Sequence, residues 1–358
     1  MYGGGVESVV MNYYRHIDRQ KVQFDFIVDS DSTLVPRQEI ESLGGRIFEI
    51  PPYQHQISYQ KNLTKLFKKQ KWKIIHSHIN TLSVFPLYVA KKLNIPVRIA
   101  HCHSTSNKKD IKRNLLKQIL KNWANVYPTH KFACSKFAGE WMFGKDSNFE
   151  IIYNAIDLDK FKYNDEMRHD LREKLKIPKD YFVVGHVGRF EIQKNHKFIV
   201  KMFNELLTRR PKSCLLLVGN GEKIDKIKKM VNDYGIAKNV IIISQSNNMQ
   251  KIYSAFDVFI LPSLFEGLPL VGIEAQVSGL ECLFSNKITK EVDVTNTSKF
   301  LSITDMTNWV NTLNNYKIEE VKRSEIDTQN FYNYNILNQS KKLTTKYQEL
   351  CKRFCNAN

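Results

Sequence analysis

The sequence predicts an α/β protein built from two domains with parallel sheets. Its 358 residues suffice for two domains of ordinary size, each with its own core. The apolar run Val258–Leu261 has the composition of a buried parallel strand, and a Gly-containing loop and a helix follow it. The same order recurs at Phe182–Val187 and Leu215–Val218, which run into Gly188 and Gly219. Repeated strand, glycine loop and helix are typical of parallel α/β sheets.

The most informative stretch is Phe265–Glu274. Pro269 stands where a first helical residue is tolerated, because its missing N–H would be unpaired there, and the helix is expected to end at Gly279. One carboxylate, Glu266, then lies in the loop and a second, Glu274, in the first turns of the helix. Helix N-termini attract phosphate and carboxylates accept hydrogen bonds from sugar hydroxyls, so the stretch fits a nucleotide-sugar.

This stretch also carries a family resemblance. The run E-G-L-P-L-V followed by E-A-Q, directly after D-V-F-I-L-P-S at residues 257–263, resembles the E-x7-E signature of retaining glycosyltransferases. More narrowly, it resembles bacterial capsule and exopolysaccharide transferases of glycosyltransferase family 4. The resemblance implies the GT-B fold, in which two Rossmann-like domains face each other across a donor-binding cleft.

The domain boundary is expected near residue 157. Residues 151–157 resemble the family's Asn-Gly-(Val/Ile)-Asp crossover into the second domain, although Ala155 replaces the usual Gly. The first domain is therefore expected at 1–157 and the second at 158–334. A C-terminal helix at 335–358 is expected to pack back on the first domain.

The resemblance implies donor roles in the second domain. Glu274 would hold the ribose hydroxyls and Glu266 the donor sugar. Arg189 and Lys194 would balance the diphosphate, whose negative charge grows as the glycosidic bond breaks. The other expected donor-binding positions are Gly4, Gly5, Gly188, Gly219, Gly221, Glu222, Ser246, Gly267, Leu268, Leu270 and Val271.

Three positions near the expected base site depart from the family pattern. Ser244, Ser246 and Asn248 stand where relatives commonly have Gly, Arg and Asp. The sequence therefore does not identify the base or the donor sugar.

Two His-x-His segments follow neighbouring expected strands. His76 and His78 come after one strand, and His101 and His103 come after Val97–Ala100. Open α/β sheets bind ligands at this edge, and two such segments favour a site over isolated structural histidines. The resemblance places His103 beside the donor sugar and acceptor hydroxyl, with His101 second and His78 on the acceptor side. Zinc binding by four His is a remote alternative, because no carboxylate or thiolate stands at convincing spacing.

No metal or other cofactor is expected. Asp29-Ser30-Asp31 has the form of a metal-binding DxD, but a turn after a strand explains it as well. The family that the chain resembles does not rely on such a metal site.

The N-terminal sheet is expected to lack a central strand. Tyr2–Gly5 is a glycine loop that enters a helix, yet no strand precedes it. The resemblance implies a strand there, so either the sheet lacks it or the natural chain starts upstream of Met1.

Positive charge is concentrated in one block. Residues 50–139 contain 17 Lys and Arg against one acid, Asp110, and thus nearly all of the net charge of +18. The segments Lys61–Lys73 and Lys108–Lys121 are expected to meet an anionic membrane surface. Ordinary packing of the second helix on its sheet explains its pattern equally well. Nucleic acid is not expected, because no recognised nucleic-acid motif accompanies the charge.

The expected location is the cytoplasm, peripheral on the inner face of the plasma membrane. No apolar run reaches the length of about 18 residues that a membrane-spanning helix needs, and the six cysteines are scattered without a C-x-x-C pair.

The leading functional prediction is a retaining glycosyltransferase that moves a sugar from a nucleotide diphosphate, preferably UDP, to a lipid-linked saccharide. One alternative is a sugar-nucleotide epimerase or hydrolase of the same shape, against which E-x7-E argues. Another is an inactive, degenerate partner protein, which the missing strand and altered base loop favour.

Overall fold

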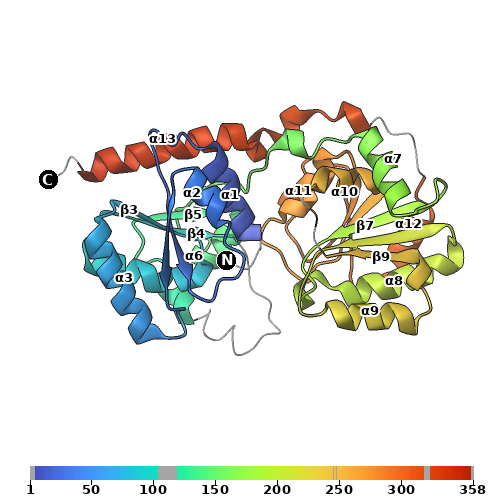
Figure 1. The fold of residues 1–358 in the computed structure, drawn as a ribbon, viewed down its shortest axis with the longest axis horizontal. Helices are drawn as coiled ribbons and strands as arrows, with labels where there is room; N and C mark the ends of the chain where they lie inside the picture. The colour runs from blue at the N-terminus through green and yellow to red at the C-terminus, as the bar shows by residue number, and fades with distance from the viewer. Residues whose placement is uncertain (1–4, 104–118, 245, 247, 318–322, 356–358) are drawn as a thin grey trace. The chain divides into compact units, whose positions relative to one another are not determined.

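A computed structural model describes residues 5–103, 119–244, 246, 248–317 and 323–355 of the chain. The chain divides into two compact units (Figure 1). Unit 1 comprises Met1–Ile156 and Asn333–Asn358, and unit 2 comprises Asp157–Tyr332. Both units are built from parallel strands with helical connections.

Unit 2 contains one six-stranded parallel sheet with the order β12-β11-β10-β7-β8-β9. Its two central strands are almost wholly buried, as parallel strands covered on both faces must be. The strands are β7 (Phe182–Val187), β8 (Ser213–Val218), β9 (Val240–Ile243), β10 (Val258–Leu261), β11 (Glu281–Ser285) and β12 (Lys299–Leu301). The helices are α7 (Asp165–Lys174), α8 (His196–Arg209), α9 (Ile224–Asp233), α10 (Met249–Ala255), α11 (Leu270–Val277) and α12 (Met306–Asn314).

The described strands of unit 1 form two separate sheets. The first pairs β1 (Asp25–Asp29) with β2 (Arg46–Ile50). The second has the order β3-β4-β5-β6 and is also parallel; its strands are β3 (Ile74–Ser77), β4 (Val97–Cys102), β5 (His130–Ala133) and β6 (Glu150–Ile151). The helices of unit 1 are α1 (Gly5–His16), α2 (Arg37–Ser42), α3 (Gln56–Gln70), α4 (Val84–Lys92), α6 (Lys136–Phe143) and α13 (Ile336–Cys355).

The C-terminal helix α13 belongs to unit 1, which confirms the predicted return to the first domain. It packs against α1, and Asn335, just before it, pairs with Ile156 in a parallel bridge. The Tyr347 hydroxyl of α13 lies 2.6 Å from His76 Nδ1 of β3. The C-terminal segment therefore contacts the first helix of unit 1, its strand β3 and the last residue before unit 2.

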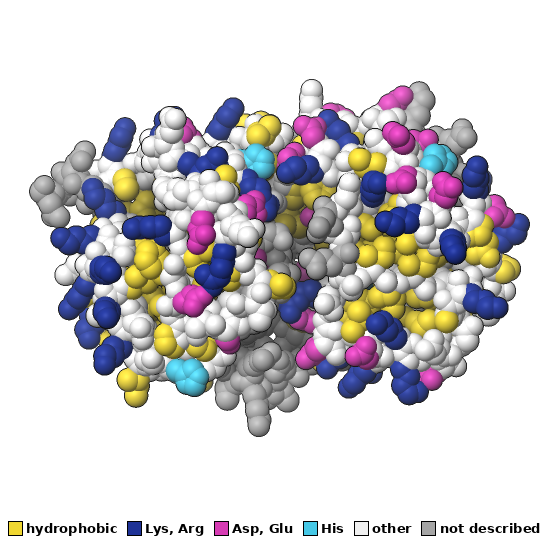
Figure 2. Space-filling model, viewed as in Figure 1, with side chains coloured by type: hydrophobic (Ala, Val, Ile, Leu, Met, Phe, Trp, Pro, Cys, Tyr) yellow, Lys and Arg dark blue, Asp and Glu magenta, His cyan; other side chains and the backbone are white. Residues whose placement is uncertain are grey.

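Helix α3 is amphipathic. It buries Tyr59, Leu63 and Phe67 and exposes the lysines of its other face. The exposed lysines in and just after the helix are Lys61, Lys65, Lys68, Lys69, Lys71 and Lys73. Figure 2 shows Lys and Arg side chains spread over the end of unit 1 that carries α3.

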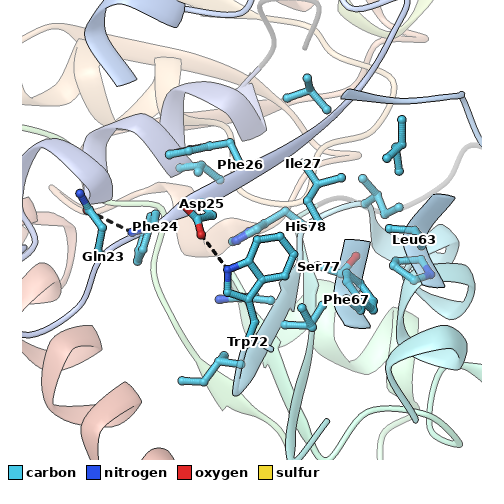
Figure 3. A pocket seen from close by; sticks show the side chains of 18 of the residues that line it. Gln23, Phe24, Asp25, Phe26, Ile27, Leu63, Phe67, Trp72, Ser77 and His78 are labelled. Atoms are coloured by element: carbon cyan, nitrogen blue, oxygen red, sulfur yellow. Dashed lines mark hydrogen bonds between the residues drawn. The ribbon is translucent and has the colours of Figure 1, made fainter. Parts of the chain in front are cut away.

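A cavity of about 650 Å³ lies between the two sheets of unit 1. It is lined by β1 on one side, by β3 on the other and by apolar side chains that include Phe26 and Leu63 (Figure 3). Trp72 and Asp25 also line the cavity, and the Trp72 indole N–H donates a hydrogen bond to Asp25 Oδ2 at 2.7 Å. Among the described residues no strand joins β1 to β3, so each has one unpaired edge beside the cavity.

One helix start differs from the prediction. Pro269 precedes α11 as its N-cap with extended backbone (ψ 113°), and the first helical residue is Leu270. The Pro269 carbonyl accepts a hydrogen bond from the Gly272 N–H at 3.0 Å. Proline therefore caps the helix from outside rather than occupying its first position.

Candidate active site

The candidate donor site lies at the carboxyl ends of β7 and β10. Strands after β7 add to one side of the sheet and strands after β10 add to the other, so the order reverses between these neighbours. Loops leave such a point in opposite directions and open a crevice, the usual ligand position in open α/β sheets. Residues 188–194 follow β7, and residues 262–269 follow β10.

Glu266 is held at this edge by two donors from the β7 loop. Lys194 Nζ lies 2.7 Å from Glu266 Oε1, and Gln193 Nε2 donates to Oε2 at 2.9 Å. The Glu266 residue is only 7% exposed. A buried carboxylate is costly unless it is paired and hydrogen-bonded, and both oxygens of Glu266 meet that condition. The structure thus unites two residues that the sequence singled out and adds Gln193, which it missed.

Glycines make the approach of these loops possible. A Cβ at Gly188 would lie 3.0 Å from Lys194 Cδ, so the lysine stem crosses directly over Gly188. A Cβ at Gly219 would lie 2.2 Å from the Gly188 carbonyl oxygen, and one at Gly221 would lie 2.7 Å from the Phe190 nitrogen. The loops after β7 and β8 therefore touch backbone to backbone, which larger residues would prevent.

The second carboxylate, Glu274, accepts a hydrogen bond at Oε2 from the Tyr253 hydroxyl of α10 at 2.6 Å. Burial raises the pKa of Glu274 to about 7, while the bond from Tyr253 and the charge of Lys194 oppose the increase. Burial also raises the pKa of Tyr253, which therefore donates at every physiological pH. Tyr253 is a second residue that sequence reasoning missed; only its position five residues before Val258 could have suggested it.

The turn from Gly267 to Val271 leads from one carboxylate to the other. Leu268 and Leu270 are buried, and they anchor the start of α11 against the unit. The partial positive charge of a helix N-terminus and the Lys194 ammonium both favour an anion at this edge.

Three other residues that were expected to bind the sugar donor form local contacts within their own segments. Arg189 is exposed and forms an ion pair with Glu191 at 2.6 Å. Glu222 is exposed and lies 3.0 Å from Lys223 Nζ. The Ser246 hydroxyl closes a local turn with the backbone of Asn248. Their assignment to a ligand rests on the family resemblance alone.

Four histidines of unit 1, His76, His78, His101 and His103, form one stack in which His101 and His103 are buried and His76 and His78 are half-buried. His76 Nε2 lies 3.1 Å from His101 Nδ1, and His78 Nδ1 lies 2.9 Å from His103 Nε2. Burial lowers the pKa of every one of these imidazoles, to about 3 for His76 and about 4 for His103. They are therefore neutral near pH 7.

Both ring nitrogens of His103 are already used. Its Nδ1 lies 3.1 Å from Asn154 Oδ1, which leaves Nε2 to accept the bond from His78. The His103 backbone N–H donates to Asn80 Oδ1 at 2.7 Å. Asn80 and Asn154 thus fix a residue that the sequence placed at the site, although neither was predicted to contribute to it.

The remaining expected site residues lie at the N-terminus. Gly5 is the first residue of α1, with open space where a Cβ would stand. Gly4 lies outside the described residues, as do residues 108–118 of the expected membrane segment Lys108–Lys121.

Residues 3–160 match the family described as Glycosyltransferase Family 4, and residues 167–324 match Glycosyl transferases group 1. The chain therefore belongs to the glycosyltransferases and is itself a glycosyltransferase with the GT-B fold.

Two relatives and one solved structure illustrate the match. "Putative glycosyltransferase EpsF" of Bacillus subtilis (strain 168) is 33% identical over 82% of this chain and 79% of its own length. The UDP-Gal:alpha-D-GlcNAc-diphosphoundecaprenol alpha-1,3-galactosyltransferase of Escherichia coli is 27% identical over 79% and 76%, respectively. The crystal structure of Anabaena HepE in complex with UDP-glucose superposes with a TM-score of 0.77 at 17% identity, covering 97% of this chain and 96% of that one. This last likeness shows the fold.

No helix in the described part of the chain is both long enough and apolar enough to cross a bilayer.

Proposed function

We propose that the protein is a retaining glycosyltransferase that moves a sugar from a UDP-sugar to a lipid-linked saccharide during capsule or exopolysaccharide synthesis. The observation that carries the proposal is the Lys194–Glu266 pair over Gly188, with Glu274 in the next helix. The resemblance to UDP-sugar enzymes and the relative that acts on a diphosphoundecaprenol saccharide support the choice of donor and acceptor.

The roles follow from charge and hydrogen-bonding capacity. Glu274 would accept hydrogen bonds from the ribose hydroxyls, and Glu266 would accept them from the donor sugar. Lys194 and Arg189 would face the diphosphate and supply the positive charge that a metal ion provides elsewhere, so no metal is required for this step. Both cations are most valuable when the leaving diphosphate forms.

The proposed chemistry is a front-face displacement. The bond from the anomeric carbon to the diphosphate oxygen breaks, and the acceptor oxygen bonds to the same face of that carbon. The acceptor proton passes to a donor phosphate oxygen, so no enzyme carboxylate acts as nucleophile. His103 would lie beside the acceptor hydroxyl and exchange the hydrogen bond it accepts from His78 for a hydrogen bond to the substrate. His101 and His78 would lie next to it on the acceptor side.

The proposal includes an anionic membrane surface as partner, on the inner face of the plasma membrane. The exposed lysines of Lys61–Lys73 support it, because each basic residue near an anionic surface contributes about 1 kcal/mol. A lipid-linked acceptor is presented at such a surface.

A donor and product assay tests the function. The purified chain is incubated with UDP- and GDP-sugars and a short-chain diphospholipid saccharide, and the released nucleotide and the product anomer are measured. The proposal predicts UDP release that depends on acceptor and a product with the donor's anomeric configuration. An inverted product would exclude retention, and absence of turnover with every donor would favour the inactive-partner alternative.

A further inference from the structure

Four imidazoles gather at one edge of the four-stranded sheet of unit 1. The register pairs His76 with Ile99 and Ser77 with Ala100, so the two His-x-His segments run side by side. Alternate residues of a strand point to the same face. The rings accordingly stack within each segment, with centroids 4.0 Å apart for His76 and His78 and for His101 and His103.

The ring nitrogens are already spaced almost like metal ligands. Two nitrogens bound to one tetrahedral zinc ion, at about 2.0–2.1 Å each, are about 3.3 Å apart. The His76–His101 and His78–His103 nitrogen pairs are separated by 3.1 and 2.9 Å. One nitrogen each of His76, His78 and His101 also lie within 4.8 Å of one another. Small ring movements would therefore let one ion take the place of the protons that lie between these nitrogens.

The outer partners fit the same role. Metal-binding imidazoles usually donate their second N–H to an oxygen, which fixes the tautomer and the ring orientation. His76 Nδ1 lies 2.6 Å from the Tyr347 hydroxyl, and His103 Nδ1 lies 3.1 Å from Asn154 Oδ1. The Asn154 oxygen can only accept, so His103 Nε2 keeps its lone pair and directs it into the cluster. The Tyr347 hydroxyl can accept as well, which permits the same tautomer in His76.

Access favours an ion as well. His76 and His78 line the cavity beside β3, which offers an ion a path and room for a water ligand.

We propose that His76, His78 and His101, with a water molecule as the fourth ligand, bind one divalent transition-metal ion, preferably Zn²⁺. Imidazoles without a carboxylate suit Zn²⁺, Cu²⁺, Ni²⁺ and Co²⁺ rather than Mg²⁺ or Ca²⁺. Binding requires only tautomer changes in His78 and His101. In each ring the proton that Nδ1 donates within the stack moves to Nε2, and Nδ1 then binds the ion. The ion would tie β3, β4 and, through Tyr347, α13 together; it is separate from the proposed diphosphate contacts of Lys194 and Arg189.

The test measures bound metal, so it is independent of sugar transfer. The full chain without an affinity tag is stripped with a chelator, loaded with Zn²⁺ or Co²⁺ and passed through gel filtration. We expect one retained equivalent and the intense visible bands of tetrahedral Co²⁺. The double variant His76→Gln/His101→Gln should retain none, whereas His130→Gln, a matched change in the neighbouring strand β5, should retain the full equivalent.

A gentler variant covers the case in which the double variant fails to fold. Tyr347→Phe removes only the hydroxyl that holds His76 and should weaken Zn²⁺ binding about 10- to 100-fold. The proposal is overturned if the parent chain retains no Zn²⁺ or Co²⁺. It is equally overturned if parent, Tyr347→Phe and His130→Gln bind these ions with the same affinity. Either result would identify the cluster as a metal-free hydrogen-bonded stack.

Discussion

The two units share one architecture but differ at the centre of their sheets. In unit 2, β7 is paired on both sides, by β8 and by β10. In unit 1, β1 and β3 each have one partner among the described strands, and a cavity of about 650 Å³ separates them. Pairing on both sides holds β7 and β10 in place and so positions the loops that follow them. Where a sheet is divided, the N–H and C=O groups along the open strand edges face the cavity instead of a neighbouring strand.

The chemistry of the two edges differs in the same way. Unit 2 presents ionised groups, Lys194 and Glu266, in direct contact. Unit 1 presents four neutral imidazoles that bond to one another. Charge in a buried setting suits a developing diphosphate, while neutral imidazoles suit an exchange of protons or a divalent transition-metal ion such as Zn²⁺.

The largest expected effect concerns packing at the two sheet centres. Phe259 of β10 is fully buried, so Phe259→Ala should lower the free energy of unfolding by about 3–5 kcal/mol. Phe26 of β1 lines the cavity, which already reduces its packing on that side, so Phe26→Ala should lower the free energy of unfolding clearly less. Urea-dependent hydrogen exchange in peptides from β10 and β1 measures the free energy of unfolding of each unit in the two variants. Equal decreases in the two variants would show that the cavity is filled in solution.

The next effect concerns the ion pair of unit 2. Glu266→Gln and Lys194→Met should each lower kcat about 10²- to 10³-fold, because they remove charge that acts on the transition state. The exposed pair Glu205–Arg209 provides the control, and Glu205→Gln should leave kcat unchanged. Wild-type kcat in both site variants would remove the pair from the chemistry.

A third prediction compares two basic helices. Changing Lys65, Lys68 and Lys69 of α3 to Glu should weaken binding to anionic liposomes by about 3 kcal/mol, roughly 100-fold. Changing Lys226, Lys228 and Lys229 of α9, also exposed, should have little effect if membrane contact belongs to unit 1. Sedimentation with anionic and neutral vesicles measures both; similar losses in the two triple variants would indicate a general charge effect.

The smallest effect is a pH dependence. Burial raises the pKa of Glu274 to about 7, and only its ionised form would accept bonds from both ribose hydroxyls in the proposed complex, so UDP-glucose affinity should rise as pH increases through 7. Tyr253→Phe removes a bond that favours the ionised form, so the midpoint should move upward and affinity at pH 7 should fall about tenfold. Calorimetric titration from pH 5.5 to 9 measures this, with Glu274→Gln as a pH-independent reference. An unchanged midpoint in Tyr253→Phe would contradict the role of that hydroxyl.

Sequence reasoning succeeded where local pattern determines structure. Val258–Leu261 and the helix after Pro269 follow from apolar runs, proline and glycine, and these elements place Glu266 and Glu274. The partners Gln193, Tyr253 and Asn154 could not be predicted, because each reaches its site through loop geometry and packing between distant segments. The neutral state of the histidines was equally hidden, since burial rather than sequence spacing lowers their pKa values.

Hydrogen exchange with and without UDP tests the assignment of the donor to unit 2 most directly. UDP should slow exchange in peptides covering residues 188–194, 219–223 and 265–274 and leave the peptides of β3 and β4 unchanged. The Glu274→Ala variant should lose this protection at the same UDP concentration. Protection confined to the histidine strands of unit 1, or none at saturating UDP, would contradict a nucleotide site built on Lys194, Glu266 and Glu274.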